Sequence, residues 1–90
     1  MYRRERSHLG MVECLEGLLI LYASTEPARG ARLYGLTTTW RTRTATPLPP
    51  IDAPPMAQAA AAMRSTLGEQ RFGEAYAEGQ TAALEEALSS

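Results

Sequence analysis

Five prolines lie within the nine residues from 47 to 55, and they constrain the fold of this chain more than any other feature. A proline disfavours helical backbone angles at the residue before it and donates no backbone hydrogen bond, so no helix crosses this stretch. The sequence therefore predicts a helical hairpin over residues 5–45, a stiff connection over 46–55 and closing helices over 56–88. Ninety residues are enough for one helical domain, 1–90.

The first helix is predicted from about Glu5 to Ala23. Apolar residues here recur at i, i+3, i+4 and i+7, a spacing that places them on one helix face. Further apolar residues widen this face until the second half of the helix is apolar nearly all round, which is typical of a central helix. The residues at this spacing are Leu15, Leu18, Leu19 and Tyr22.

Three small residues of the same helix carry expectations of their own. Gly10 and Gly17 lie seven residues apart on one face, where we expect another backbone to pack closely, since glycine otherwise weakens a helix. Cys14 is the single cysteine, so no internal disulfide is available. Its apolar surroundings predict a buried thiol rather than a reactive one.

A second helix is predicted from about residue 27 to Arg43, with Ser24 or Thr25 as its N-terminal cap. Six of the ten residues from 37 to 46 are threonine, so an edge strand is the alternative for this stretch. We favour a helix because the chain offers no second strand for pairing. The residues of this helix expected to face the core are Leu33, Leu36 and Trp40.

Two to three further helices are predicted after the connection. Asp52 is expected to cap the first of them, and Gly68 to end it in a left-handed conformation. Its apolar seam consists of Met56, Ala60, Met63 and Leu67. The next helix is expected to bury Phe72, Ala75, Tyr76 and Gly79. A short last helix, capped by Thr81, is expected to bury Leu84, Ala87 and Leu88. With no credible strand, the predicted class is all-α.

Charge is distributed unevenly along the chain. Residues 1–50 contain seven arginines against four acids, and residues 51–90 contain two against six. The asymmetry can orient a partner or a second copy, but nucleic-acid grooves normally show more charge with interleaved aromatics, so nucleic acid is not the expected partner. The absence of lysine and the abundance of alanine point to a GC-rich bacterial genome. The candidate basic surface consists of Arg29, Arg32, Arg41 and Arg43.

No set of residues predicts catalysis. His8 is the single histidine and lies near the chain start, where a solvated side chain is expected. Glu74 and Glu78 stand four residues apart, but without histidine or further acids nearby they predict a solvated face, as do Glu85 and Glu86. We therefore expect no enzyme activity, no metal and no cofactor. A metal-dependent enzyme at Glu74 and Glu78 is a minor alternative.

No segment is expected to insert in or cross a membrane. The longest apolar run, residues 18–23, is far too short to span a bilayer. Acids at positions 13 and 16 interrupt the apolar core that a signal peptide needs. A cytoplasmic location is therefore expected.

Five stretches resemble the C-terminal region of a family of large bacterial regulators. The first two look like a degenerate tetratricopeptide-type helical hairpin, and the others look like the segment that closes it. The stretches are Glu13-Cys-Leu-Glu-Gly-Leu-Leu, Pro27-Ala-Arg-Gly-Ala-Arg-Leu-Tyr-Gly-Leu, Pro47-Leu-Pro-Pro, and Met63-Arg-Ser-Thr-Leu-Gly-Glu-Gln-Arg-Phe-Gly-Glu-Ala-Tyr-Ala-Glu-Gly-Gln with Leu84-Glu-Glu-Ala-Leu. The family is that of LuxR-type and related ATPase-containing multidomain transcriptional regulators, many of them actinobacterial.

The resemblance covers about residues 9–88 and implies the end of an α-solenoid, which presents a surface to protein partners and carries neither the ATPase nor the DNA-reading domain. The chain departs from the pattern in its hairpin loop, Ser24-Thr25-Glu26, which lacks the usual glycine, and at Gly30 and Thr37–Thr39.

We therefore expect a non-catalytic protein–protein interaction module. A small nucleic-acid-associated regulator using the arginine-bearing half is the alternative, and it predicts DNA binding that weakens steeply with salt. One hairpin is fewer than the roughly three repeats that normally bury a continuous core, so self-association through the first hairpin is also expected. The candidate surface for a partner or a second copy consists of Leu15, Leu18, Leu19, Tyr22, Tyr34 and Trp40.

Overall fold

A computed structural model describes residues 2–89 of the chain, with side chains from residue 9 to residue 83. Between residues 2 and 89 the chain contains helices and no strand, so the all-α prediction is confirmed. The elements are α1 (Tyr2–Thr25), α2 (Pro27–Thr44), a short 3-10 helix η1 (Pro50–Asp52), α3 (Ala53–Leu67) and α4 (Glu69–Ser89).

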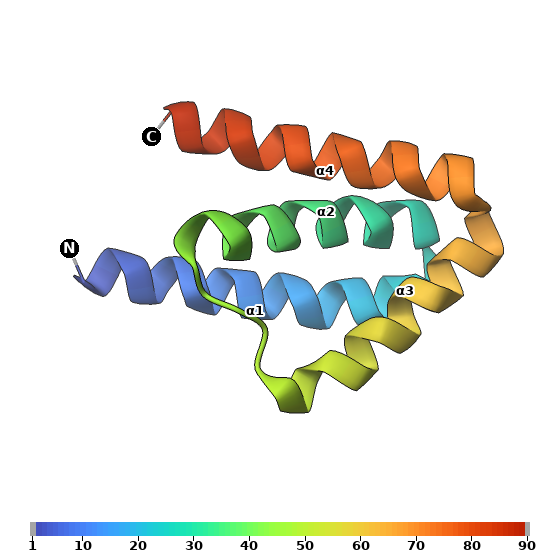
Figure 1. Ribbon diagram of the computed structural model, residues 1–90, viewed down its shortest axis with the longest axis horizontal. Helices are drawn as coiled ribbons and strands as arrows, with labels where there is room; N and C mark the ends of the chain where they lie inside the picture. The colour runs from blue at the N-terminus through green and yellow to red at the C-terminus, as the bar shows by residue number, and fades with distance from the viewer. Residues whose placement is uncertain (1, 90) are drawn as a thin grey trace.

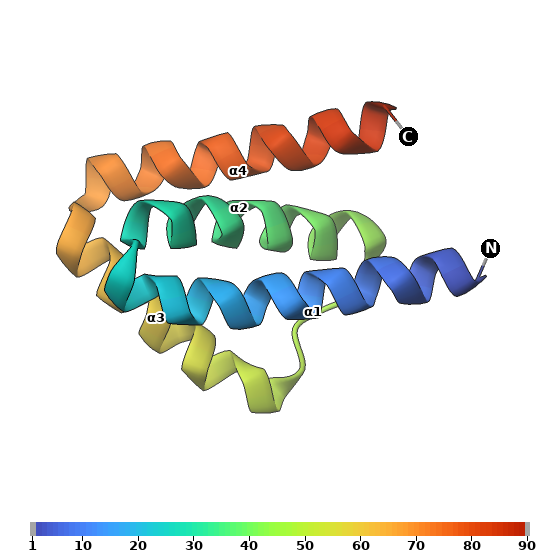
Figure 2. The same cartoon turned by 180° about the vertical axis from the view of Figure 1, so that it is seen from behind.

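Three of the helices form a layer, and α3 crosses one side of it. α2 lies between α1 and α4, runs in the same direction as α4 and runs opposite to α1 (Figure 1). The view from behind shows α1 in front of α3 (Figure 2). The shortest dimension of the molecule is 19 Å, which corresponds to two helix layers. Contact between α2 and α4 is the most extensive of any helix pair.

A single residue, Glu26, joins α1 to α2. It adopts φ −138° and ψ 74° because the proline at position 27 excludes helical angles there, and the chain reverses at once. The prediction that Ser24 or Thr25 caps α2 is wrong. They lie in the last turn of α1, and both hydroxyls donate to the Leu21 carbonyl, at 3.4 and 3.2 Å.

The threonine-rich stretch belongs to α2 as far as Thr44, so the helix favoured over an edge strand is confirmed. The helix ends where Ala45 takes a left-handed conformation, with φ 53° and ψ 41°. The N–H of Thr46 then donates to the carbonyl of Arg41 at 3.0 Å, which closes the helix end in the manner of a Schellman motif. Pro47 follows and directs the chain into the connection.

The second half differs from expectation in its caps and in the number of helices. Asp52 does precede α3, but its side chain makes no capping hydrogen bond. Gly68 ends α3 at φ 83° and ψ 159°, a conformation open essentially to glycine but not the left-handed helical one that we expected. Thr81 caps nothing: it lies inside α4 and its hydroxyl donates to the Ala77 carbonyl at 3.0 Å. The predicted fifth helix is therefore part of α4. The side chains of Leu84, Ala87 and Leu88 lie outside the described residues.

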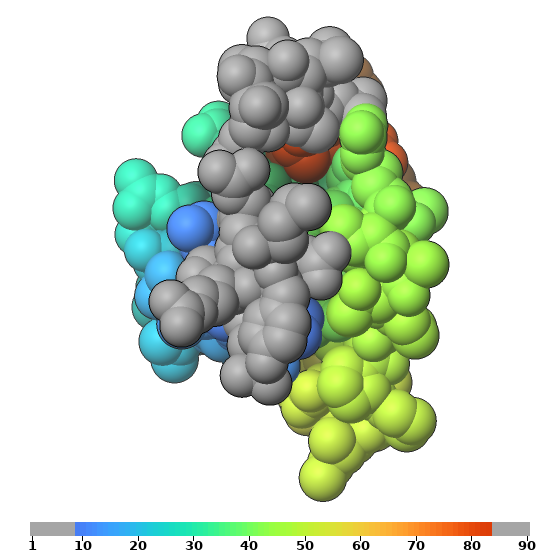
Figure 3. Space-filling model, turned by 90° about the vertical axis from the view of Figure 1, so that its left-hand side faces the viewer, coloured from blue at the N-terminus to red at the C-terminus, as the bar shows by residue number. Residues whose placement is uncertain are grey.

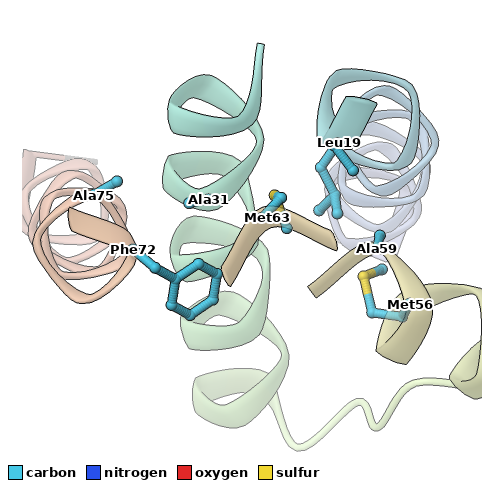
Figure 4. Close-up of a cluster of buried hydrophobic side chains, with 8 residues drawn as sticks. Leu19, Ala31, Met56, Ala59, Met63, Phe72 and Ala75 are labelled. Atoms are coloured by element: carbon cyan, nitrogen blue, oxygen red, sulfur yellow. The ribbon is translucent and has the colours of Figure 1, made fainter. Parts of the chain in front are cut away.

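The core forms where α3 meets the layer of three helices. Met63 is fully buried between Leu19 of α1 and Ala31 of α2, and Phe72 points from α4 toward α2 (Figure 4). The predicted seam of α3 is buried at three of its four positions, and Leu67 is half-buried. Much of the core consists of alanine, which lets the helices approach one another closely.

Two glycines make the tight contact between α2 and α4 possible. A Cβ atom added to Gly79 would collide with the backbone carbonyl of Arg32, and one added to Gly35 would collide with the backbone carbonyl of Tyr76. Both obstacles are backbone atoms, which move only if a whole helix moves. The two helices can therefore lie this close only with glycine at positions 35 and 79.

The close backbone approach expected at Gly10 and Gly17 is absent. An added Cβ would meet nothing within 4 Å at either position, because that side of α1 faces away from the other described helices. The prediction for these two glycines is therefore wrong, and the close backbone approach occurs at Gly35 and Gly79 instead.

We predict opposite effects for two glycine substitutions on α4. Gly79→Ala should destabilise the fold by about 1–3 kcal/mol or more, because the new methyl group overpacks a backbone contact. Gly73→Ala, where an added Cβ meets nothing within 4 Å, should stabilise it by about 0.5–1 kcal/mol through helix propensity. Urea unfolding followed by circular dichroism measures both. Similar effects at the two positions would contradict the close contact.

Candidate interaction surface

A stripe of apolar side chains lies on the outer side of α1. The stripe consists of Met11, Cys14, Leu18 and Leu21. These residues are three, four and three positions apart, so they fall within an arc of about 80° on a helix with 3.6 residues per turn. Met11 is 54% exposed, Leu18 40% and Leu21 66%, and Cys14 is exposed as well. We call these four residues the α1 stripe. No segment crosses in front of α1 in the view from behind (Figure 2).

The opposite side of α1 faces the core. Val12, Leu19 and Ala23 are at most 5% exposed. Leu19, which the sequence placed in the partner surface, is therefore a core residue. The reason is that Leu18 and Leu19 are neighbours on a helix that is apolar nearly all round, so periodicity alone does not decide which arc turns inward.

The other residues of the predicted surface take three different positions. Leu15 and Tyr22 are half-buried and lie beside the α1 stripe. Tyr34 packs against two aromatic rings of α4, with centroids 5.3 Å from Tyr76 and 6.3 Å from Phe72, and so supports the α2–α4 contact. Trp40 is half-buried on α2. Of the six residues proposed, only Leu18 belongs to the α1 stripe.

Cys14 is exposed rather than buried, which corrects the sequence prediction. The apolar neighbours of Cys14 along the chain predicted burial, but its spacing from the other apolar residues of α1 places it on the arc that lies on the outer side. Read with Met11, Leu18 and Leu21, Cys14 completes a three–four–three pattern, which is the spacing of the inner positions of a coiled coil. This spacing marks the four residues as one apolar stripe in the sequence, but it does not decide whether the stripe faces the core or the solvent.

A buried ion pair joins α1 and α2 on the inner side. Nε and Nη2 of Arg41 donate to the two carboxylate oxygens of Glu16, at 2.5 and 2.8 Å. Nη1 of Arg41 donates to the carbonyls of Thr46 and Pro47, at 3.1 and 3.2 Å. Both charged residues are 8% exposed. The prediction that Arg41 belongs to an exposed basic surface is therefore wrong, and Arg41 is a structural residue.

Arg41 keeps its charge in this site. Its hydrogen bonds with Glu16 raise the pKa of Arg41 above its ordinary value, and they outweigh burial, which acts in the other direction. Paired charges with several hydrogen bonds are the form in which buried charge is tolerated. One guanidinium group therefore holds α1, α2 and the start of the connection together.

A pocket of about 550 Å³ lies beside this ion pair and opens to solvent. Figure 3 shows the end of the molecule along which the connection runs, coloured green to yellow-green. The two charged groups in the pocket wall already bind each other, so neither presents a ready acid, base or anion site. The lining residues are Glu16, Tyr34, Thr37, Thr38, Arg41, Thr42, Ala45, Pro47, Leu48 and Met56.

The remaining arginines of the predicted basic surface do not form a continuous patch. Arg32 donates to Glu78 at 3.0 Å. Arg29 lies 3.6 Å from Glu26, and hydrogen bonding with Tyr22 followed by attraction to Glu26 raises the pKa of Arg29 above its ordinary value. Each of these two cations thus has an acidic neighbour. The fourth, Arg43, is exposed on the last turn of α2.

Glu74 and Glu78, the two acids considered for a metal site, have different surroundings. Glu78 is engaged by Arg32, and Glu74 is exposed. Within the part of the chain that the structure describes, no three histidine, cysteine or acidic residues come together as metal ligands. The side chains of His8, Glu85 and Glu86 lie outside that part.

Among the described residues, no helix is long and apolar enough to cross a membrane.

Comparison with known proteins gives no match, whether with protein-family models, with curated proteins or with solved structures. The resemblance stated above therefore rests on the quoted residues alone.

We predict that Arg41→Met destabilises the fold by about 3–5 kcal/mol, because it leaves the Glu16 carboxylate buried without a partner. The matched control Arg43→Met, two residues further along the same helix and exposed, should change stability by no more than about 0.5 kcal/mol. Urea unfolding measures both variants.

The double variant Glu16→Leu/Arg41→Met distinguishes a desolvated charge from general disruption of the core. It should recover most of the lost stability, since an apolar pair often replaces a buried ion pair at little cost. Recovery stays incomplete because the Thr46 and Pro47 carbonyls lose their donor. A double variant as unstable as Arg41→Met alone would contradict this account of the ion pair.

Proposed function

We propose that this chain is a non-catalytic protein–protein interaction module that contacts its partner through the α1 stripe. The observation that carries the proposal is the exposure of Met11, Leu18 and Leu21 along one arc of a helix whose opposite side is packed. Single exposed apolar residues are ordinary, but a row of them on one helix is typical of an interaction site.

The composition of α1 supports this proposal further. Glu13 and Glu16 are the only charged residues between Leu9 and Thr25, and Glu16 is turned inward to Arg41. Glu13 lies about 120° from the centre of the α1 stripe on a helix of 3.6 residues per turn. A solvated helix normally carries charged side chains on its outer face. The outer face of α1 is instead suited to another apolar helix.

The arrangement of the helices supports a more specific proposal. α1 and α2 form an antiparallel hairpin, and α3 and α4 follow a proline-rich connection, which is the order expected from the resemblance to LuxR-type regulators. We propose that the chain acts in the cytoplasm as the closing end of a tetratricopeptide-like helical array in a bacterial transcriptional regulator.

Site-specific photo-cross-linking in cells of the source organism tests this function. A photoreactive amino acid in place of Leu21 should give protein adducts severalfold more abundant than the same group in place of Gln80, which is exposed on α4. Mass spectrometry of the adducts then identifies what is bound. Equal, background-level adducts at positions 21 and 80 would refute the interaction module.

A further inference from the structure

We propose that the α1 stripe binds the α1 stripe of a second copy of this chain, with the two α1 helices antiparallel about a twofold axis. The inference rests on the proposed function, because it names the occupant of the same surface. Four features of α1 lead to it: the spacing of the stripe, its small residues, its charge and its area.

The spacing is that of a coiled-coil seam, with Met11 and Leu18 at one inner position of the heptad and Cys14 and Leu21 at the other. When two α1 helices are placed antiparallel about the point midway between Cys14 and Leu18, every layer of the seam contains at least one large apolar side chain. Met11 meets Leu21 of the second copy, and Cys14 meets Leu18. A parallel pair would place Cys14 against Cys14, and two small side chains in one layer leave the seam underfilled.

Small residues line one flank of the stripe. Gly10 and Gly17 have no neighbour within 4 Å of an added Cβ, so nothing in the described fold requires glycine there. In the antiparallel pair Gly17 lies close to the twofold axis and faces its own equivalent. Two glycines at that position let the helix backbones come close, as small residues do at other tight helix contacts.

The charge of this face also fits a second copy. Because the α1 stripe carries no charged residue, it offers no complement to a charged partner surface, whereas a copy of itself is equally apolar. The antiparallel arrangement also places the positive end of one helix dipole beside the negative end of the other. A parallel pair would bring like ends together.

The area of the stripe is sufficient for a weak dimer. From the exposed fractions of Met11, Leu18 and Leu21, with Cys14 and the flanking residues, pairing covers about 500 Å² per copy, or about 1,000 Å² in total, the lower limit for a specific interface. We therefore expect a weak dimer in equilibrium with a folded monomer.

Sedimentation velocity of the full chain from low micromolar to millimolar concentration tests the pairing. The wild-type protein should shift from monomer to dimer, and Leu21→Glu should stay monomeric with an unchanged circular dichroism spectrum. Ile51→Glu is the matched control, since Ile51 is 83% exposed in η1, away from α1, and its variant should still dimerise. A wild-type monomer throughout, or a Leu21→Glu variant that still dimerises, overturns the proposal.

Oxidation of single-cysteine variants tests the orientation. In a Cys14→Ser background, a mixture of Met11→Cys and Leu21→Cys proteins should form a mixed disulfide, and Leu21→Cys alone should form none. The reverse result would mean a parallel pair and would overturn the antiparallel arrangement. If the chain is monomeric but position 21 captures other proteins in cells, the second copy is excluded while the interaction function stands.

Discussion

The arrangement of the helices depends on the guanidinium group of Arg41. It binds both oxygens of Glu16 on α1 and two carbonyls of the connection, Thr46 and Pro47, so a single side chain fixes three segments. The carbonyls just beyond a helix end have no partner within the helix, and Arg41 supplies one. Because the connection leads directly into η1 and α3, this contact also determines where α3 meets the layer and hence which side of α1 is buried.

The central position of α2 imposes a second constraint. A helix with neighbours on several sides normally carries a wide apolar surface, yet α2 is rich in threonine and arginine. It is accommodated by small residues instead: Ala31 and Gly35 are buried, and Gly79 of α4 faces its backbone. Close backbone approach thus replaces large apolar side chains, and the buried Arg41 replaces an apolar residue at the far end.

Local patterns predicted most of the helices, because prolines and glycines act on their own neighbours. The proline at position 27 and Gly68 mark helix boundaries that the structure confirms. The prediction of a separate fifth helix was wrong, because the hydroxyl of Thr81 donates to a carbonyl within its own helix instead of capping a new one. The pairing of Glu16 with Arg41 could not be predicted from the sequence, because 25 residues separate the two and nothing in the sequence distinguishes either from an ordinary surface charge. That pairing decides which arc of α1 is buried, so the α1 stripe could not be assigned without it.

The exposed stripe and the core occupy opposite sides of one helix, which links association to stability. Leu18 faces outward and Leu19 inward, so a partner that covers the stripe also restrains the helix that supplies the core. Ligands that bind only the folded state stabilise it in proportion to the logarithm of their concentration. Among the residues whose side chains are described, few large ones are buried, and the packing relies on alanines, glycines and one buried ion pair. Association through α1 would therefore stabilise the helix bundle itself, in addition to recruiting a partner.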